Sequence, residues 1–415
     1  MSRLIPDWIT GFLSYTENTE PARLFQTWGA MSVIASALRK KVCLALGRIR
    51  VYPNLFVVFV AEPGVARKTQ AITFTLEFFN AIPDIVVSAD ATSREAMLED
   101  LESSARDDEL PDGSILRHAS ITVASKEFES FIGNKKDNTK MLVTLTDLFD
   151  SNELPWKYRA KISKSSTVPS VFINLIAATT PSSIASQFPV SAIGGGLASR
   201  IIYVWAESKW MKSPRPEYSQ ILALLKEAMV SDLFQISRIA GTYEMTQECC
   251  KEWDEWYLSY DEVGIDRICK DPSFNGWYSR KPMYMLKVAT VCAASESNDL
   301  IIEWRHIERS LKLIEEIEGG LSNVFRSLGR SEVSTDVDTV VGVVKALGKI
   351  SDKELLARVW RDMDTIKFDT VVKTAIRAGK IKREYKGVAG TNKGYIMYYD
   401  PELEFRLPKK PIAEM

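Results

Sequence analysis

The sequence holds little of what builds metal sites or disulfide frameworks. Its 415 residues include only five cysteines and two histidines, and no two cysteines are spaced as a CxxC pair. Such spacing argues against a structural zinc site and against a network of disulfides. The sequence shows no secretory signal either, and free thiols then indicate a reducing compartment. We therefore expect a cytoplasmic protein.

The sequence also lacks a charge excess and a long apolar run. Its formal net charge is −1, with 53 basic and 54 acidic residues. A surface that is basic everywhere is excluded, so any nucleic-acid contact has to come from local basic patches. The longest apolar run, Leu55–Ala61, is far shorter than a membrane-spanning helix, and we expect no membrane contact.

The first region, residues 1–50, has the pattern of a helical segment. Apolar residues recur at helical spacing, at Leu24, Trp28, Met31, Ile34 and Leu38. The basic run Arg39-Lys40-Lys41 follows, where cations suit the negative end of a helix dipole. We expect a packing helix with a solvated basic end.

The second region, residues 51–213, alternates apolar runs with helical segments. Five short runs predict strands at 55–60, 85–87, 121–123, 172–178 and 201–205. Helical segments lie between them at 70–79, 93–101 and 140–149. This alternation predicts a parallel sheet with crossover helices, an α/β core.

After about Pro214 the pattern changes to helices only. Periodicity predicts an all-helical lid domain over 214–330, with helices at 221–229, 247–257, 281–294 and 306–325. The small, polar segment 327–334 predicts a linker. Residues 335–405 then predict three helices, with a capping box at Ser351 and a glycine cap at Gly379, followed by two strands. That order is the plan of a winged-helix domain.

A candidate phosphate-binding loop lies between the strand at 55–60 and the helix at 70–79. Backbone amides and a helix N-terminus facing phosphate are what a P-loop requires, with Lys68 reaching the β and γ oxygens and Thr69 holding Mg²⁺. Glu62 and Arg67 replace the terminal glycines of the usual motif. A chance Lys-Thr pair at a helix start is the alternative. The expected ATP-binding residues are Pro63, Gly64, Val65, Ala66, Arg67, Lys68, Thr69 and Gln70.

Two later strand ends carry polar side chains that ATP hydrolysis needs. Glu127 follows the strand at 121–123 and is the candidate general base, although Lys126 stands where a metal-holding aspartate is expected. Thr180, with Thr179 second, is the candidate γ-phosphate sensor at the end of the strand at 172–178. The alternatives are a solvated glutamate and a hydroxyl that satisfies local backbone.

Two arginines complete the candidate ATPase site. Arg200 comes just before the strand at 201–205 and could stabilise transition-state charge. We expect that strand on the far side of the sheet order from Lys68, so Arg200 would act on a neighbouring subunit in a head-to-tail ring. Arg280 opens a helix of the lid and could close over the nucleotide. An ordinary surface arginine is the alternative for each.

This order of motifs resembles the plan of AAA+ helicases, with an AAA+ or RecA-like P-loop core. The segment LASRIIYVW resembles the arginine-finger segment of MCM-type helicases. The segment YPNLFVVFVAEPGVARKT is similar to the RK[ST]-type P-loop of an ATPase family found beside primases in phages and mobile elements, akin to superfamily-3-like helicases. The resemblance covers roughly residues 5–320.

That resemblance implies an ATP- and Mg²⁺-dependent DNA helicase or translocase of phage or mobile-element replication. It further implies a homo-hexameric ring, a primase or polymerase partner, and the host cytoplasm as location. Two alternatives stay open. One is a DNA-binding ATPase switch, such as an initiator or helicase loader, and the other is a scaffold with a degenerate nucleotide site.

Two basic segments are candidate nucleic-acid contacts. Basic residues alternate with aromatic or apolar ones in a predicted hairpin that would contact single-stranded DNA in the ring channel: Lys157, Arg159, Lys161 and Lys164. Residues 364–394 hold eight basic and three acidic residues. A duplex-binding winged helix would use Lys373, Arg377, Lys382 and Arg383. A solvated hairpin and a protein-docking module are the respective alternatives.

Overall fold

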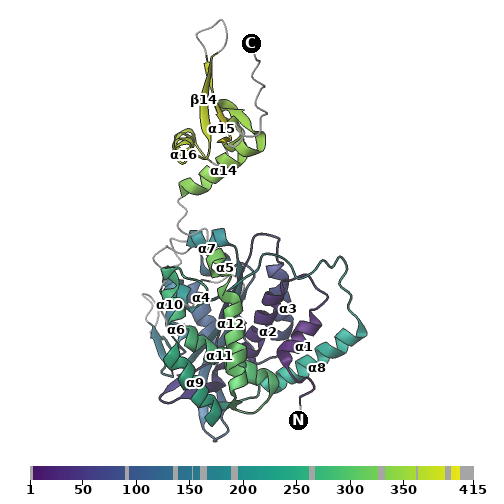
Figure 1. Cartoon of the computed structure of the whole chain (residues 1–415). Helices are drawn as coiled ribbons and strands as arrows, with labels where there is room; N and C mark the ends of the chain where they lie inside the picture. The colour runs from purple at the N-terminus through teal and green to yellow at the C-terminus, as the bar shows by residue number, and fades with distance from the viewer. Residues whose placement is uncertain are drawn as a thin grey trace. The chain divides into compact units, whose positions relative to one another are not determined.

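The computed structural model describes residues 3–88, 93–133, 139–151, 153–158, 166–187, 195–260, 267–325, 332–360, 363–387 and 394–401. The chain divides into two compact units, Met1–Leu328 and Gly329–Met415. The regions expected at 1–50, 51–213 and 214–330 therefore pack together in one unit, which ends at Leu328 (Figure 1). Within the described ranges, no helix combines the length and apolar character needed to cross a membrane.

A largely parallel sheet of six strands forms the centre of the first unit. Its order is β10-β3-β9-β6-β4, and β5 pairs with β6 in the antiparallel sense. The strands are β3 (Phe56–Val60), β4 (Val87–Ser88), β5 (Ala105–Glu109), β6 (Ile115–Ser125), β9 (Val171–Thr179) and β10 (Ile202–Trp205). Every residue of β3 and β9 is buried, as expected for apolar runs covered on both faces. The prediction of an α/β core with a parallel sheet is confirmed.

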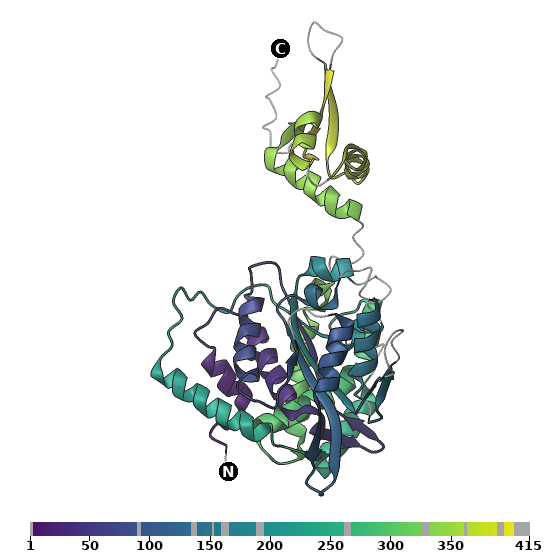
Figure 2. The same ribbon diagram turned by 180° about the vertical axis from the view of Figure 1, so that it is seen from behind.

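Helices cover both faces of this sheet, as Figure 2 shows. One layer holds α2 (Arg23–Leu38) and α3 (Lys68–Phe79). The other holds α4 (Arg94–Ser103) and α6 (Thr139–Phe149), which are joined by a 2.7 Å hydrogen bond from Arg94 Nε to Thr144 Oγ1. Short helices α5 (Phe128–Ile132) and α7 (Pro181–Gln187) follow β6 and β9.

A second sheet was not anticipated from the sequence. Its order is β12-β11-β1-β2, with β1 (Val42–Leu46), β2 (Ile49–Val51), β11 (Gly241–Met245) and β12 (Ile301–Ile302). The predictions that residues 1–50 are helical throughout and that strands stop after Pro214 are therefore wrong. The strands are short, and β1 pairs in parallel with β11 about two hundred residues later. Local periodicity cannot detect such a pairing.

The basic run after α2 is buried, so the prediction of a solvated helix end is wrong. Arg39, Lys40 and Lys41 are 3%, 1% and 8% exposed. Arg39 forms ion pairs with Asp84 and Asp108 at 3.3 and 3.4 Å. Lys41 Nζ donates to the carbonyl of Ser237 at 2.6 Å. The run turns the chain from α2 into β1, and its charges find partners inside the protein.

The remaining helices of the first unit are α1 (Trp8–Tyr15), α8 (Gln220–Ile236), α9 (Gln247–Ser259), α10 (Asn275–Tyr278), α11 (Lys281–Glu296), α12 (Trp304–Glu318) and α13 (Leu321–Val324). The helices predicted at 221–229, 247–257 and 281–294 are present, the first extending to Ile236, whereas the short helix at 275–278 was not predicted. The single helix expected at 306–325 is interrupted between α12 and α13. A Cβ at Gly320 would lie 2.6 Å from the Cβ of Trp205, so only glycine permits this close packing.

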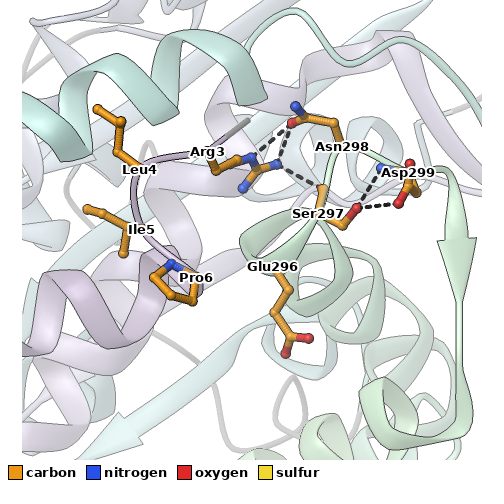
Figure 3. Close-up of a pocket in the computed structure, with 8 residues that line it drawn as sticks. All are labelled: Arg3, Leu4, Ile5, Pro6, Glu296, Ser297, Asn298 and Asp299. Carbon is orange, nitrogen blue, oxygen red and sulfur yellow. Dashed lines mark hydrogen bonds between the residues drawn. The ribbon is translucent and has the colours of Figure 1, made fainter. Parts of the chain in front are cut away.

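The chain segment before α1 is tied to the turn after α11, where residues of both line a small cavity (Figure 3). Arg3 donates to Asn298 Oδ1 through Nε at 2.9 Å and through Nη2 at 2.7 Å, and to the carbonyls of Ser295 and Ser297. The amides of Leu4 and Ile5 donate to the buried carboxylate of Asp232. Because protein acceptors occupy its donors, Arg3 serves as an anchor for this segment.

The second unit has its own hydrophobic core. Its elements are α14 (Glu332–Leu347), β13 (Lys349–Ser351), α15 (Asp352–Val359), α16 (Thr365–Arg377), β14 (Lys382–Gly387) and β15 (Gly394–Tyr399). The capping box joins Ser351 and Glu354 as predicted, and Gly379 after α16 has a φ of +68°. The antiparallel sheet has the order β13-β15-β14, and β13 was not predicted.

Candidate nucleotide site

The loop from Ala61 to Arg67 joins the buried strand β3 to the start of α3. Gly64 has a φ of +73°, which glycine adopts without strain. Arg67 caps α3 at φ +57° and ψ +40°, an uncommon left-handed conformation for a residue with a side chain. The chain thus turns sharply just before Lys68, and the N-terminus of α3 faces the loop.

Lys68 is the first residue of α3, and its side chain folds back over the loop. Its Nζ donates to the carbonyls of Ala61 at 2.6 Å and Glu62 at 3.2 Å. Burial lowers the pKa of Lys68, and the charge of Glu62 opposes that shift. A half-buried ammonium that donates to two loop carbonyls is suited to a phosphate, because a bound anion would supply the opposite charge.

A cavity of about 510 Å³ lies at this loop, within the size range of small-molecule sites. Its lining includes two of the expected ligands of phosphate and Mg²⁺, Lys68 and Thr69. The full lining is Glu20, Gly64, Arg67, Lys68, Thr69, Gln70 and Thr73. Pro63 and Val65 are exposed on the loop, and Ala66 is buried beneath it, where its carbonyl accepts from the amide of Ala22 at 3.2 Å.

Glu20 is a residue of this cavity that the sequence did not indicate. Its Oε2 lies 2.7 Å from Nε of Arg67, and its Oε1 accepts from Lys209 Nζ. The hydrogen bonds from Lys209 and then from Arg67 lower the pKa of Glu20 to about 2. Glu20 precedes α2, 47 positions before Arg67, and no spacing rule links the two.

A second cavity, of about 430 Å³, borders the same segment. Its walls come from the start of α2, the residues after β10 and the break between α12 and α13. Arg23 lies over the ring of Trp210 at 5.4 Å from its centroid. The hydrogen bond between Ala22 and Ala66 places this cavity next to the loop.

The strand register brings the ends of β3, β9 and β6 to one edge of the sheet. Val60 pairs with Thr179, and Ala177 pairs with Ser125. Because neighbouring strands are about 4.8 Å apart, the end of β6 lies roughly 10 Å from the end of β3. The three polar positions at these ends, at Lys68, Thr180 and Glu127, therefore share the edge where ligands of parallel sheets bind.

Glu127 and Thr180 differ in how their side chains are held. Glu127 is exposed before α5, and its Oε2 lies 3.4 Å from Ser130 Oγ. Lys126 beside it is half-buried. Thr180 caps α7, where its Oγ1 accepts from the amide of Ser183 at 3.2 Å. This is the local backbone role that the sequence left open as the alternative for Thr180.

Arg200 lies at the amino-terminal end of β10, whereas the loop follows the carboxyl-terminal end of β3. The strand β10 that follows it is the immediate neighbour of β3, so the prediction that this strand lies on the far side of the sheet order is wrong. Both strands run parallel, and Ile202 pairs with Val57. Arg200 is thus separated from the loop by roughly 20 Å along the strands, and it does not reach the loop of its own chain.

Arg200 is bound within its own subunit and is 14% exposed. It pairs with Asp150 at 3.2 Å and donates to the carbonyl of Gly196 at 3.0 Å. Its Nε has no hydrogen-bond partner in the part of the chain that the structure describes. Any action on another molecule therefore requires Arg200 to leave Asp150.

Arg280 lies near Arg200 and does not cover the loop. Tyr284 Oη donates to the carbonyl of Ser199. Burial raises the pKa of this tyrosine, and the nearby charges of Arg280 and Arg200 both oppose that rise. The sequence-based expectation that Arg280 closes over the nucleotide of its own chain is therefore corrected. The cause is the packing of α11 against the residues before β10, a long-range contact that the sequence does not reveal.

The predicted basic hairpin is described only in part. Strands β7 (Trp156–Tyr158) and β8 (Ser166–Val168) pair in the antiparallel sense, as a hairpin requires. Lys157 is exposed, and the rings of Trp156 and Tyr158 are stacked 5.3 Å apart. Arg159, Lys161 and Lys164 lie outside the described residues.

The predicted nucleic-acid residues of the second unit are all exposed. Lys373 and Arg377 lie on α16, one helical turn apart, opposite the buried Phe368 and Val371. Lys382 and Arg383 lie on β14. Residues directly opposite on paired strands share a face, so the buried Tyr398 opposite Arg383 puts Arg383 and Lys382 on different faces.

A metal ion at the loop would depend on few protein ligands. Across the described ranges, no three His, Cys, Asp or Glu side chains gather as a metal site. Thr69, exposed in the first turn of α3, remains the candidate ligand. The scan against protein-family models gives no match, and no curated protein matches the sequence.

Proposed function

We propose that the protein is an ATP- and Mg²⁺-dependent helicase or translocase that acts on DNA. One observation carries the proposal. Lys68 begins the helix that follows the buried central strand β3 and its loop, and its half-buried ammonium donates to loop carbonyls beside a cavity of about 510 Å³. A cation held in this way at a helix N-terminus favours a polyphosphate ligand.

Each residue of the edge has a defined task in this proposal. ATP with Mg²⁺ supplies the phosphoryl group and the cation that neutralises it, with Thr69 as the ligand from the protein. Lys68 neutralises phosphate charge, Thr180 orients a phosphate oxygen, and Glu127 accepts a proton from the attacking water. The cavity beside Trp210 would hold the adenine base of ATP.

The positions of Arg200 and Arg280 support an assembly of subunits in a ring. Both lie at the edge opposite the loop, so each can serve a nucleotide only if that nucleotide belongs to another subunit. A head-to-tail ring, which we propose to be a homo-hexamer, brings opposite edges of neighbouring subunits together. Arg200 would then exchange Asp150 for the neighbour's phosphate.

The DNA contacts divide between the two units. The β7–β8 hairpin would bind single-stranded DNA in the ring channel, and the second unit, as a winged helix, would bind duplex through α16. Replication of phage or mobile-element DNA with a primase or polymerase partner, in the host cytoplasm, completes the proposal.

Phosphate release measured with and without single-stranded DNA tests the proposal. We expect DNA-stimulated hydrolysis that Lys68→Ala abolishes and that the exposed control Lys212→Ala retains. Strand displacement then separates a helicase from a DNA-binding switch, which hydrolyses ATP without unwinding. DNA binding without any hydrolysis would establish a scaffold with a degenerate nucleotide site.

A further inference from the structure

The sheet of the second unit has one face in the core and one in solvent. Ile350 of β13 and Tyr398 of β15 pair with each other and are both buried. They share their core with Phe368 and Val371 of α16. Because side chains alternate along a strand, the neighbouring positions of all three strands point to the opposite, outer face.

This outer face carries a line of large side chains between lysines. Tyr395, Met397 and Tyr399 follow one another along the central strand β15. Lys382 lies opposite Tyr399 and Lys386 opposite Tyr395 on β14, and Lys349 lies opposite Tyr399 on β13. We call these six residues the outer sheet face. Its strands β14 and β15 extend beyond the helices of this unit (Figure 1).

The charge of the outer sheet face is positive. Among its exposed members are Lys349, Lys382 and Lys386. The acidic residue in the same register is Glu384, and it is bound to Lys349. Lys349 Nζ also lies 5.1 Å from the ring centroid of Tyr399, and Tyr395 is 47% exposed. Exposed aromatic surface and basic groups thus occur side by side.

We propose that the outer sheet face binds single-stranded nucleic acid. Tyrosine rings on a flat sheet can stack on bases only when the bases are unpaired, and flanking lysines follow the phosphate backbone. A duplex keeps its base faces stacked internally and accepts a helix in its major groove. The charge of the outer sheet face complements a polyanion, whereas a protein partner would need no such charge.

The inference assigns two nucleic-acid surfaces to one small unit. Lys373 and Arg377 of α16 face solvent on the side of the shared core away from the outer sheet face. A duplex on α16 and a single strand on the sheet can therefore be bound together, as at a junction between them. The inference deepens the DNA-binding part of the proposed function and does not depend on ATP hydrolysis.

The β14–β15 strand pair supplies a matched control. Tyr385 of β14 is opposite Ile396, which lies on the same face of β15 as the buried Tyr398. Tyr385 is therefore on the other side of the sheet from Tyr395. Tyr385 is 66% exposed. Two exposed tyrosines on the same strand pair therefore differ in the face they occupy, and only Tyr395 belongs to the outer sheet face.

The test uses the full chain with a fluorescent 15-mer of thymidine and with a 15-base-pair duplex. We expect Tyr395→Ala to weaken single-strand binding about five-fold or more, the effect of losing one stacked base. Tyr395→Phe, which keeps the ring, and Tyr385→Ala should bind within about two-fold of the parent chain. Duplex binding should be unchanged by Tyr395→Ala and weakened by Lys373→Ala.

Two further measurements separate this surface from the channel hairpin. An oligonucleotide carrying 5-iododeoxyuridine should crosslink to the peptide that contains Tyr395 and Tyr399. The double variant Lys382→Ala/Lys386→Ala should reduce the slope of log affinity against log salt by about 1.4. Crosslinks confined to other peptides, or single-strand binding unchanged in both variants, would overturn the inference. Capture of a protein by this face, with no loss of single-strand affinity on mutation, would also overturn it.

These outcomes are independent of the ATPase proposal. A chain that crosslinks through the outer sheet face but does not hydrolyse ATP would keep the inference and refute the proposed activity. A chain that hydrolyses ATP with DNA stimulation but fails all three measurements would keep the activity and refute the inference.

Discussion

Nε of Arg67 lies 2.7 Å from Oε2 of Glu20, so the arginine beside Lys68 is neutralised from another part of the chain. The same carboxylate accepts from Lys209 and from the amide of Ser213 at 3.3 Å. Glu20 therefore places a negative charge in the cavity proposed for phosphate, and a bound phosphate has to compete with it for Arg67.

We predict that Glu20→Gln raises affinity for ATP about five-fold, because one like charge leaves the site and Arg67 is released toward the phosphates. Titration with a fluorescent ATP analogue measures this. Glu17→Gln, an exposed glutamate in the same segment, serves as control and should change nothing. Weaker binding in Glu20→Gln would mean that Glu20 is needed to hold the loop in its binding shape.

Glu127→Gln should slow ATP hydrolysis at least about 100-fold with little change in KM. The amide keeps the size of the side chain but cannot accept a proton. General-base catalysis typically increases the rate of a reaction by a factor of about 10²–10⁴. Steady-state phosphate release measures both constants. Glu129→Gln, two residues along on α5, should retain activity. If Glu127→Gln is as active as the parent chain, the base lies elsewhere.

Arg200→Ala should reduce hydrolysis on the order of 10³-fold while nucleotide binding is almost unchanged. Mixing inactive Arg200→Ala and Lys68→Ala subunits should restore some activity, because one interface then joins an intact arginine to an intact lysine. Titrating one variant into the other and recording turnover tests this. No recovery at any ratio, or a fully active monomer, would contradict the ring.

The buried lysines Lys40 and Lys287 predict a pH dependence of stability. Burial lowers the pKa of each to about 7, with the charge of Lys287 adding to the shift of Lys40. An unfolded lysine has a pKa of about 10.4, so between these values the unfolded chain binds more protons. The contribution of these groups to the free energy of unfolding therefore rises from about pH 7 to pH 10 and is level below pH 7.

Removing one of these lysines should flatten that rise. Lys287→Met should show a smaller increase in melting temperature between pH 7 and pH 9 than the parent chain, measured by circular dichroism. Lys251→Met, whose side chain is 75% exposed, should keep the full increase. Equal increases in all three proteins would show that Lys287 is not the source of the pH dependence.

Those features that depend on neighbours in sequence could be predicted. The apolar run at Phe56–Val60 and the capping box at Ser351 are determined by residues close together in the sequence, and both appear where expected. Features that depend on distant partners could not. The pairing of β1 with β11, the carboxylate of Glu20 at Arg67, and the partners of Arg39 all join segments that no periodicity connects.

The anchoring of Arg3 also sets an order of events during synthesis. Its acceptor Asn298 is 295 positions later in the chain. At about 5–20 residues per second, the segment before α1 waits roughly 15–60 s for its partners to be made. The amides of Leu4 and Ile5 wait similarly for Asp232. The segment before α1 therefore lacks these partners through most of translation, and its anchoring is complete only once α11 and the turn after it have been made.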